Sequence, residues 1–242
     1  MAKRKPQRRL GRDLRPHARL RNGLRVRMFE GPRLADGVVS ATPDEVIAAL
    51  DRLDPELPWK KVRDQVVPVL PRVRPFPGPD LDLVRTVLPP GILVSFAIDI
   101  GPALTHIGSD LLESWPIDRA TLVSTGLANL RRLADDCGPE RVLHDHIGDV
   151  PIGVFQSRVG IASATLLIPD RLALILGAGP HLLLAPMRDV LITLPADVDC
   201  EFAAWLAEEW EALDPNHLHL GAFRYADGAV VPVALEDGAA RA

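Results

Sequence analysis

The sequence has few of the residues on which disulfide scaffolds and cysteine-rich metal sites depend. Its only cysteines, Cys137 and Cys200, lie 63 positions apart, and neither has a CxxC neighbour. A disulfide framework or a cysteine metal cluster is therefore not expected. We predict two reduced, buried thiols, as is usual in a cytoplasmic protein.

Long apolar runs are also absent. No run approaches the roughly 20 residues that a membrane-spanning helix needs, because proline, glycine or a charged residue interrupts each one. Residues 1–6 are basic, but the apolar segment of a secretory signal does not follow them. The prediction is a cytoplasmic protein with no membrane partner.

Catalytic and phosphate-binding motifs are lacking too. The sequence contains neither a GxSxG elbow nor an HExxH zinc motif. Gly177 and Gly179 are followed by Pro180 and a predicted strand, where a phosphate or dinucleotide loop would need the N-terminus of a helix. An NTPase or a Rossmann oxidoreductase is therefore disfavoured, and no cofactor is predicted.

Charge, by contrast, is abundant and unevenly distributed. Residues 1–27 hold eleven Lys and Arg and one acid, Asp13, a net charge of +10; the other 17 basic and 31 acidic residues give −14 for the rest. Large apolar residues are few and isolated in residues 1–27, so this segment cannot bury enough surface to offset its ordering entropy. We predict a flexible basic arm over residues 1–27, with order beginning near Val26.

Such an arm is suited to binding a polyanion. Cations on a flexible segment attract RNA or DNA by releasing counterions, and the affinity then falls steeply with salt. No aromatic residue lies between these arginines, so base stacking is not offered and binding should be independent of sequence. The alternative is a solubilising tail that folds back on the acidic body of the same or a neighbouring chain. The anion-binding candidates in the arm are Lys3, Arg4, Lys5, Arg8, Arg9 and Arg12.

Residues 28–242 are predicted to form a single α+β domain. Strands arrive as pairs between helices, which favours a mixed or largely antiparallel sheet with packed helices. Seven prolines in residues 68–90 permit only edge or extended segments, so this stretch is interpreted as a long connection. The predicted strands are residues 91–100, 104–107, 141–143, 150–155, 182–185, 190–194, 223–225 and 230–233. The predicted helices are residues 42–54, 110–114, 118–134 with Asp118 as its cap, 161–176 with an interruption at Pro169, and 199–213.

Four short blocks carry a resemblance to a known family. They are the strand at residues 92–99, Leu-Ala-Asn-Leu-Arg at 127–131, Pro-Met-Arg-Asp-Val at 186–190 and Phe-Arg-Tyr at 223–225. In the order and spacing of these blocks, over roughly residues 40–235, the chain resembles the YtpQ-like family of bacterial proteins of unknown function. The resemblance implies a bacterial cytoplasmic protein and brings no catalytic residue to these positions. The basic arm departs from the family pattern.

Histidine pairs are the clearest candidates for metal binding. His144 and His146 are two positions apart, with Asp149 close behind them, and His217 and His219 form a second pair. Residues two apart on a strand share a face, so each pair could present two imidazoles to one metal ion. Because no further ligand motif accompanies them, surface histidines are the favoured interpretation.

Two charged residues at the ends of apolar strands are the remaining candidates. Arg188, beside Asp189, is interpreted either as an anion-binding group or, preferably, as part of a structural ion pair or cap. Asp99 lies at the end of the clearest strand, and a turn residue before Gly101 is preferred there to a catalytic carboxylate, since no second carboxylate lies at a diagnostic spacing.

The sequence as a whole predicts a non-enzymatic binding or accessory module. The basic arm would tether it to a polyanion such as RNA or DNA, and the body could bind a protein partner or a second copy of the chain. The alternative is a hydrolase or metal-dependent enzyme that uses His144, His146, Asp149 or Arg188 in a cleft.

Overall fold

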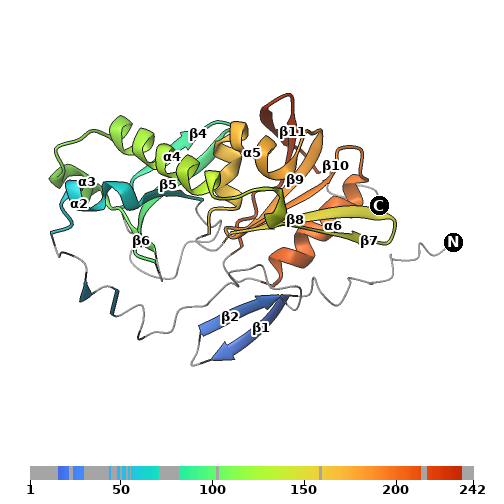
Figure 1. Cartoon of the computed structure of the whole chain (residues 1–242), viewed down its shortest axis with the longest axis horizontal. Coiled ribbons are helices and arrows are strands. Elements are labelled where there is room, and N and C mark those ends of the chain that lie inside the picture. The colour runs from blue at the N-terminus through green and yellow to red at the C-terminus, as the bar shows by residue number, and fades with distance from the viewer. Residues whose placement is uncertain are drawn as a thin grey trace, which may run out of the picture.

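In the computed structural model, the strands among the described residues form three antiparallel sheets: a two-stranded hairpin, a four-stranded sheet and a six-stranded sheet (Figure 1). Helices pack on both larger sheets, which confirms the predicted α+β class with largely antiparallel pairing. The residues that the structure describes are 16–21, 24–29, 44, 48, 49, 51, 52, 54, 56–70, 82–101, 104–157, 160–213 and 217–235.

The four-stranded sheet is built around β5 (Ile92–Asp99), the apolar run that stands out most clearly in the sequence. β3 (Val66–Val69) pairs with one side of β5, and β4 (Arg85–Leu88) and β6 (Leu104–His106) pair in succession with the other side. β3 contains Pro68 and lies at the sheet edge, where a residue without an N–H is tolerated. The two described strands of the proline-rich connection are thus edge strands, as predicted, whereas residues 71–81 lie outside the described residues.

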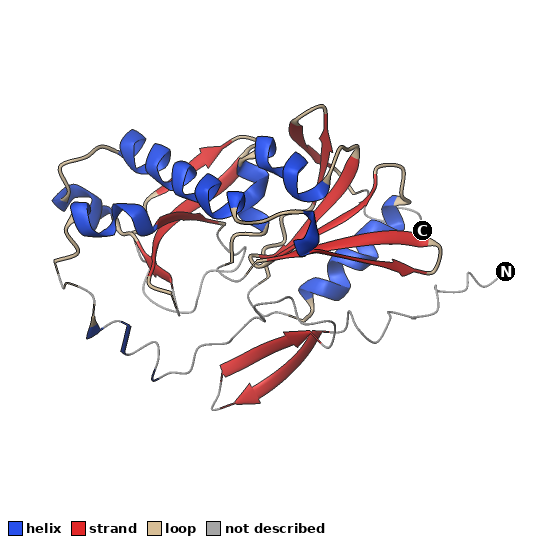
Figure 2. Ribbon diagram, viewed as in Figure 1, coloured by secondary structure: helices blue, strands red, loops and turns tan. Residues whose placement is uncertain are grey.

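Helix α4 (Arg119–Asp135) covers one face of the four-stranded sheet (Figure 2). Asp118 caps it as predicted, because the Asp118 carboxylate accepts a hydrogen bond of 2.8 Å from the Thr121 N–H. Gly126 lets the helix approach the sheet closely, since a Cβ atom there would lie 3.0 Å from the Phe96 ring. The shorter helical segments beside α4 are α2 (Trp59–Val62), η2 (Arg63–Gln65) and α3 (Ser109–Ser114).

A buried amide also ties α4 to this sheet. Asn129 Nδ2 donates to the carbonyl oxygens of Arg63 and Val66, at 2.7 Å and 2.9 Å. The buried face of this helix, which holds Leu122, Gly126, Leu130 and Ala134, therefore also contains one polar residue, whose amide binds two backbone carbonyl oxygens.

The six-stranded sheet has the strand order β12-β11-β9-β10-β8-β7, so β7 and β12 are its outer strands. Its β11–β12 hairpin turns at Asp227 and Gly228, both with positive φ, as the Asp-Gly signal predicts. The strands are β7 (Val142–Ile147), β8 (Val150–Gln156), β9 (His181–Met187), β10 (Val190–Pro195), β11 (Ala222–Ala226) and β12 (Ala229–Val233). The accompanying helical segments are η3 (Pro139–Arg141), η4 (Ser163–Leu167), α5 (Pro169–Leu176) and α6 (Cys200–Glu211).

The central strands of this sheet are buried on both faces. Along β9, Leu183 and Ala185 belong to one apolar cluster, and Leu182 and Leu184 belong to another. The first cluster contains η4 and α5, and the second contains α6. Burial on two faces explains why these strands read as continuous apolar runs instead of alternating ones.

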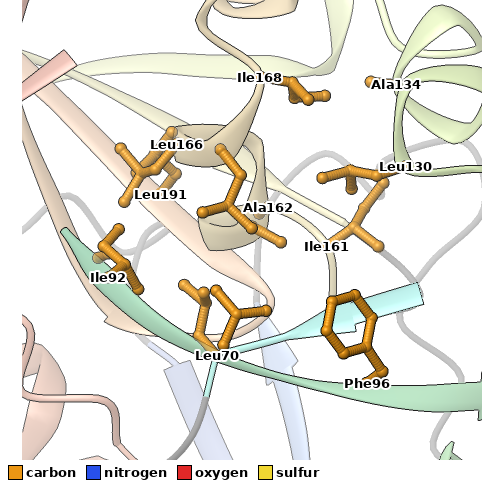
Figure 3. Close-up of a cluster of buried hydrophobic side chains, with 14 of the residues drawn as sticks. Leu70, Ile92, Phe96, Leu130, Ala134, Ile161, Ala162, Leu166, Ile168 and Leu191 are labelled. Atoms are coloured by element: carbon orange, nitrogen blue, oxygen red, sulfur yellow. The ribbon is translucent and has the colours of Figure 1, made fainter. Parts of the chain in front are cut away.

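One apolar core joins the two larger sheets. Its cluster includes Phe96 from β5, Leu130 from α4 and Leu191 from β10. Figure 3 shows Leu70 and Ile92 near Leu191, and Phe96 on the side of Leu130. Residues of both sheets therefore lose stabilising contacts together if this core is disturbed.

One predicted helix is interrupted where the sequence predicts, and another is only partly described. The helix predicted at residues 161–176 is divided into η4 and α5, with Pro169 at the first position of α5 as expected. In the helix predicted at residues 42–54, only a few residues are described, and Asp44, Ala48 and Asp51 among them are helical. Along the described part of the chain, no helix combines the length and the apolar character that crossing a bilayer requires.

Candidate functional site

Strands β1 (Pro16–Arg21) and β2 (Leu24–Phe29) form the two-stranded hairpin in the basic segment. The antiparallel register runs from Pro16 opposite Phe29 to Arg21 opposite Leu24. Within the described chain, neither strand joins the four-stranded or the six-stranded sheet, and Figure 1 shows the hairpin beside them. This part of the predicted flexible arm therefore has regular structure, whereas residues 1–15 lie outside the described residues.

The hairpin concentrates positive charge. Its two strands hold four arginines and no acidic residue. The register sets each arginine opposite an uncharged residue: Arg19 opposite Val26, Arg21 opposite Leu24, Arg25 opposite Leu20 and Arg27 opposite Ala18. Like charges directly opposite each other destabilise a strand pair, so this register accommodates four cations without such a pair.

Sequence reasoning based on charge and on helical periodicity misses this hairpin. The signal that finds it is Asn22-Gly23, which separates two segments of alternating basic and apolar residues. The other anion-binding candidates of the arm lie outside the described residues: Lys3, Arg4, Lys5, Arg8, Arg9 and Arg12.

Arg188 lies at the turn between β9 and β10 and is half-buried. Its Nε donates a hydrogen bond of 3.0 Å to the carbonyl oxygen of Leu70, the residue after β3. This bond links the six-stranded sheet to the four-stranded sheet. It favours the structural interpretation of Arg188 over the anion-binding one.

A buried serine, Ser163, holds the same turn, and no pattern in the sequence distinguishes it. Its Oγ lies within hydrogen-bond distance of the carbonyl oxygens of Met187 and Val190, so it can donate to either. The Ser163 N–H donates to the Arg188 carbonyl oxygen at 3.1 Å. The polar groups around this turn therefore serve its backbone.

The histidine pair of β7 faces solvent. His144 and His146 are both exposed and lie on one face of the strand, and Asp149 is exposed in the turn that follows. Among the described residues, no group of three or more His, Cys, Asp or Glu could hold a metal ion. His219 instead has Glu211 as a neighbour, with Nδ1 and Oε2 2.9 Å apart. The metal-site hypothesis thus gains no support from the part of the chain that is described.

Asp99 ends β5 beside an open hollow of about 310 Å³. One of its carboxylate oxygens accepts a hydrogen bond of 2.8 Å from the Gly101 N–H, which is the bond that a turn residue makes. Burial raises the pKa of the Asp99 carboxyl because it disfavours the charged form, and the Gly101 bond opposes this. The bond supports the turn interpretation. The residues that line the hollow are Ala49, Arg52, Gln65, Asp99, Ile100 and Gly101.

The cysteines differ in exposure. Both are free thiols, and Cys137 is half-buried while Cys200 is exposed. The prediction that both are buried is therefore wrong for Cys200, because it begins α6 at the solvent side of the helix. Burial raises the pKa of the Cys137 thiol, so the nucleophilic thiolate is disfavoured there.

Comparison of the chain with protein-family models, with curated proteins and with solved structures finds no match in any of the three.

Proposed function

We propose that this protein is a binding or accessory module that attaches to nucleic acid through its basic N-terminal segment. One observation carries the proposal: residues 1–27 have a net charge of +10, and the rest of the chain has a net charge of −14. A charge separation of this size confines the attraction for a polyanion to one part of the molecule. The folded body then serves as the part that binds a protein partner or a second copy of the chain.

The acidic body also restricts where nucleic acid can bind. Its negative charge repels phosphate groups, so the contact with nucleic acid should be limited to the basic segment. The described part of that segment holds four arginines in two paired strands, and the sequence of these strands contains no acidic residue. Binding of this kind depends on phosphates and releases counterions, so it should weaken steeply as salt is raised.

The alternative enzyme function has less support. His144, His146 and Asp149 are exposed, and no metal-binding group forms among the residues that the structure covers. Arg188 donates to a backbone carbonyl oxygen. The resemblance to the YtpQ-like family and the cytoplasmic location stay predictions, and neither adds a catalytic residue to the body.

Fluorescence anisotropy with a labelled 20-base-pair DNA duplex and a labelled 20-nucleotide RNA tests the proposal. One variant of the full chain changes the six arm candidates to glutamine: Lys3→Gln, Arg4→Gln, Lys5→Gln, Arg8→Gln, Arg9→Gln and Arg12→Gln. The control carries the same charge change on six exposed residues of the body: Arg52→Gln, Lys60→Gln, Arg63→Gln, Arg85→Gln, Arg119→Gln and Arg224→Gln.

For duplex DNA, each lost phosphate contact lowers the slope of log affinity against log salt by about 0.9. The arm variant should therefore lose up to about 5 from this slope, with a loss of more than tenfold in affinity at about 50 mM salt. The control should keep the wild-type slope. Equal losses in the two variants would show that the net charge of the molecule matters and not the segment, and would contradict the proposal. So would a wild-type protein that binds neither probe at low salt.

A further inference from the structure

We infer that the β1–β2 hairpin enters the major groove of B-form duplex DNA as a two-stranded ribbon. This inference rests on the proposed nucleic-acid binding and names its partner. The hairpin is a sheet of its own, made of two six-residue strands in continuous antiparallel register. The major groove, about 12 Å wide, admits a two-stranded ribbon of this kind.

The dimensions of the ribbon match a short stretch of duplex. Neighbouring strands lie about 4.8 Å apart, so two strands with their side chains fill a groove of that width. Six residues at about 3.4 Å each give a ribbon of roughly 20 Å. That length corresponds to about six base-pair steps along the helix axis.

The arginines are distributed in a way that suits a groove with two phosphate walls. Residues opposite each other in an antiparallel pair share a face, and successive residues alternate between faces. The register therefore assigns positions 19 and 21 to one face and positions 25 and 27 to the other. Each strand of the ribbon also holds one pair of arginine positions, and the two strands of an inserted ribbon lie along the two walls of the groove, so each wall has cations beside it.

Single-stranded nucleic acid and duplex RNA fit the hairpin less well. Single-strand binding relies on successive aromatic side chains on which bases stack, and Phe29 is the one Phe, Tyr or Trp in residues 1–29. The major groove of A-form RNA is deep and narrow, and protein side chains do not reach its floor. The partner that combines two phosphate walls with an accessible groove is duplex DNA.

The test compares three probes of one sequence with the full chain: a 20-base-pair DNA duplex, one of its strands and the matching RNA duplex. We expect the DNA duplex to bind at least tenfold more tightly than the other two. Val26→Pro keeps every charge but removes an N–H from the middle of β2 and disfavours the paired strand. It should lose about tenfold on the DNA duplex and leave the single-strand affinity unchanged, whereas the control Val26→Thr should bind as the wild type does.

Two further variants separate the faces. Arg19→Gln/Arg21→Gln and Arg25→Gln/Arg27→Gln should each lower the salt slope for duplex DNA by about 2. Circular dichroism melting confirms that the body of each variant is folded. Equal affinity for duplex and single strand, or a Val26→Pro variant that binds duplex DNA as Val26→Thr does, would overturn the groove assignment and leave the proposed function standing. Absence of binding to every probe by the wild type would overturn both.

Discussion

The close contact between Gly153 and Thr193 allows a quantitative test of the six-stranded sheet. The two residues are opposite each other in the β8–β10 pair. A Cβ atom at Gly153 would lie 2.4 Å from Thr193 Cγ2 and 3.1 Å from Val142 Cγ1. The first distance is too short for two carbon atoms, so Gly153→Ala requires Thr193 or the backbone to shift.

The expected cost follows from two opposing effects. Overpacking a well-filled core costs about 1–3 kcal/mol. Replacing a glycine inside a strand returns about 0.5–1 kcal/mol, because the unfolded chain loses conformational freedom. The net loss of stability should be at most about 2.5 kcal/mol. A domain of this size loses about 2–4 °C in Tm for each kcal/mol.

A second substitution identifies the atom responsible. Thr193→Ser removes Cγ2 and keeps the hydroxyl, so Gly153→Ala should cost little or nothing in that background. A double-mutant cycle by urea unfolding should give a coupling energy of about 1–3 kcal/mol between the two positions, because the cycle isolates the overpacking cost. If Gly153→Ala destabilises both backgrounds equally, the Thr193 methyl group is not the obstacle and the reasoning is refuted.

Two further predictions concern polar groups. Asp99→Asn keeps the acceptor for the Gly101 N–H and removes a charge that burial disfavours. The pKa of Asp99 is higher in the folded protein than its ordinary value of 3.8. Between these two pKa values the unfolded chain binds fewer protons than the folded protein, so the stability of the wild type falls as the pH rises through this interval. The variant should therefore be more stable than the wild type at pH 7 and should lose this advantage toward about pH 3 in urea titrations, and a deficit at pH 7 would contradict the prediction. Asn129→Ala removes the amide donor from two carbonyl oxygens, of which that of Arg63 keeps its bond from the Val66 N–H, and it should cost about 1–3 kcal/mol. Asn129→Asp places carboxylate oxygens next to these acceptors and should cost more at pH 7. An Asp variant as stable as the Ala variant in thermal melts would show that the amide does not donate there.

The elements that the sequence predicts well are those with local signals. Asp118 marks the start of α4, Pro169 marks the start of α5, and Asp227 with Gly228 marks the turn between β11 and β12. In each case a side chain or a restricted backbone angle acts within a few residues, so the signal is present in the sequence itself.

The strand order could not be predicted in this way. β9 lies between β10 and β11, and its pairing with β11 joins residues about forty positions apart. Packing decides such pairings, and an apolar run that is buried on both faces carries no register of its own. Asn129 is another example. The role of its amide depends on the carbonyl groups of Arg63 and Val66, which lie more than sixty positions earlier in the chain, so the sequence does not reveal it.

The candidate site likewise has some features that local sequence signals predict and others that depend on contacts between distant residues. Charge segregation can be counted in the sequence, and Asn22-Gly23 is a local hairpin signal that a search for a period of two would find. The role of Arg188 could not be found, because its acceptor, the Leu70 carbonyl oxygen, lies 118 positions earlier in the chain. The pair Arg188 and Asp189 in the sequence does not reveal which backbone group the arginine binds.

The two outer strands of the six-stranded sheet have a consequence that we expect to show at high protein concentration. β7 has exposed His144 and His146 along its length, and β12 has Pro232. An added strand would have to displace water from imidazoles at one border, and would meet a missing N–H at the other. We therefore expect these two strands to disfavour sheet growth from molecule to molecule, the route to fibrils, and we expect the histidines that suggest metal ligands in the sequence to contribute to this.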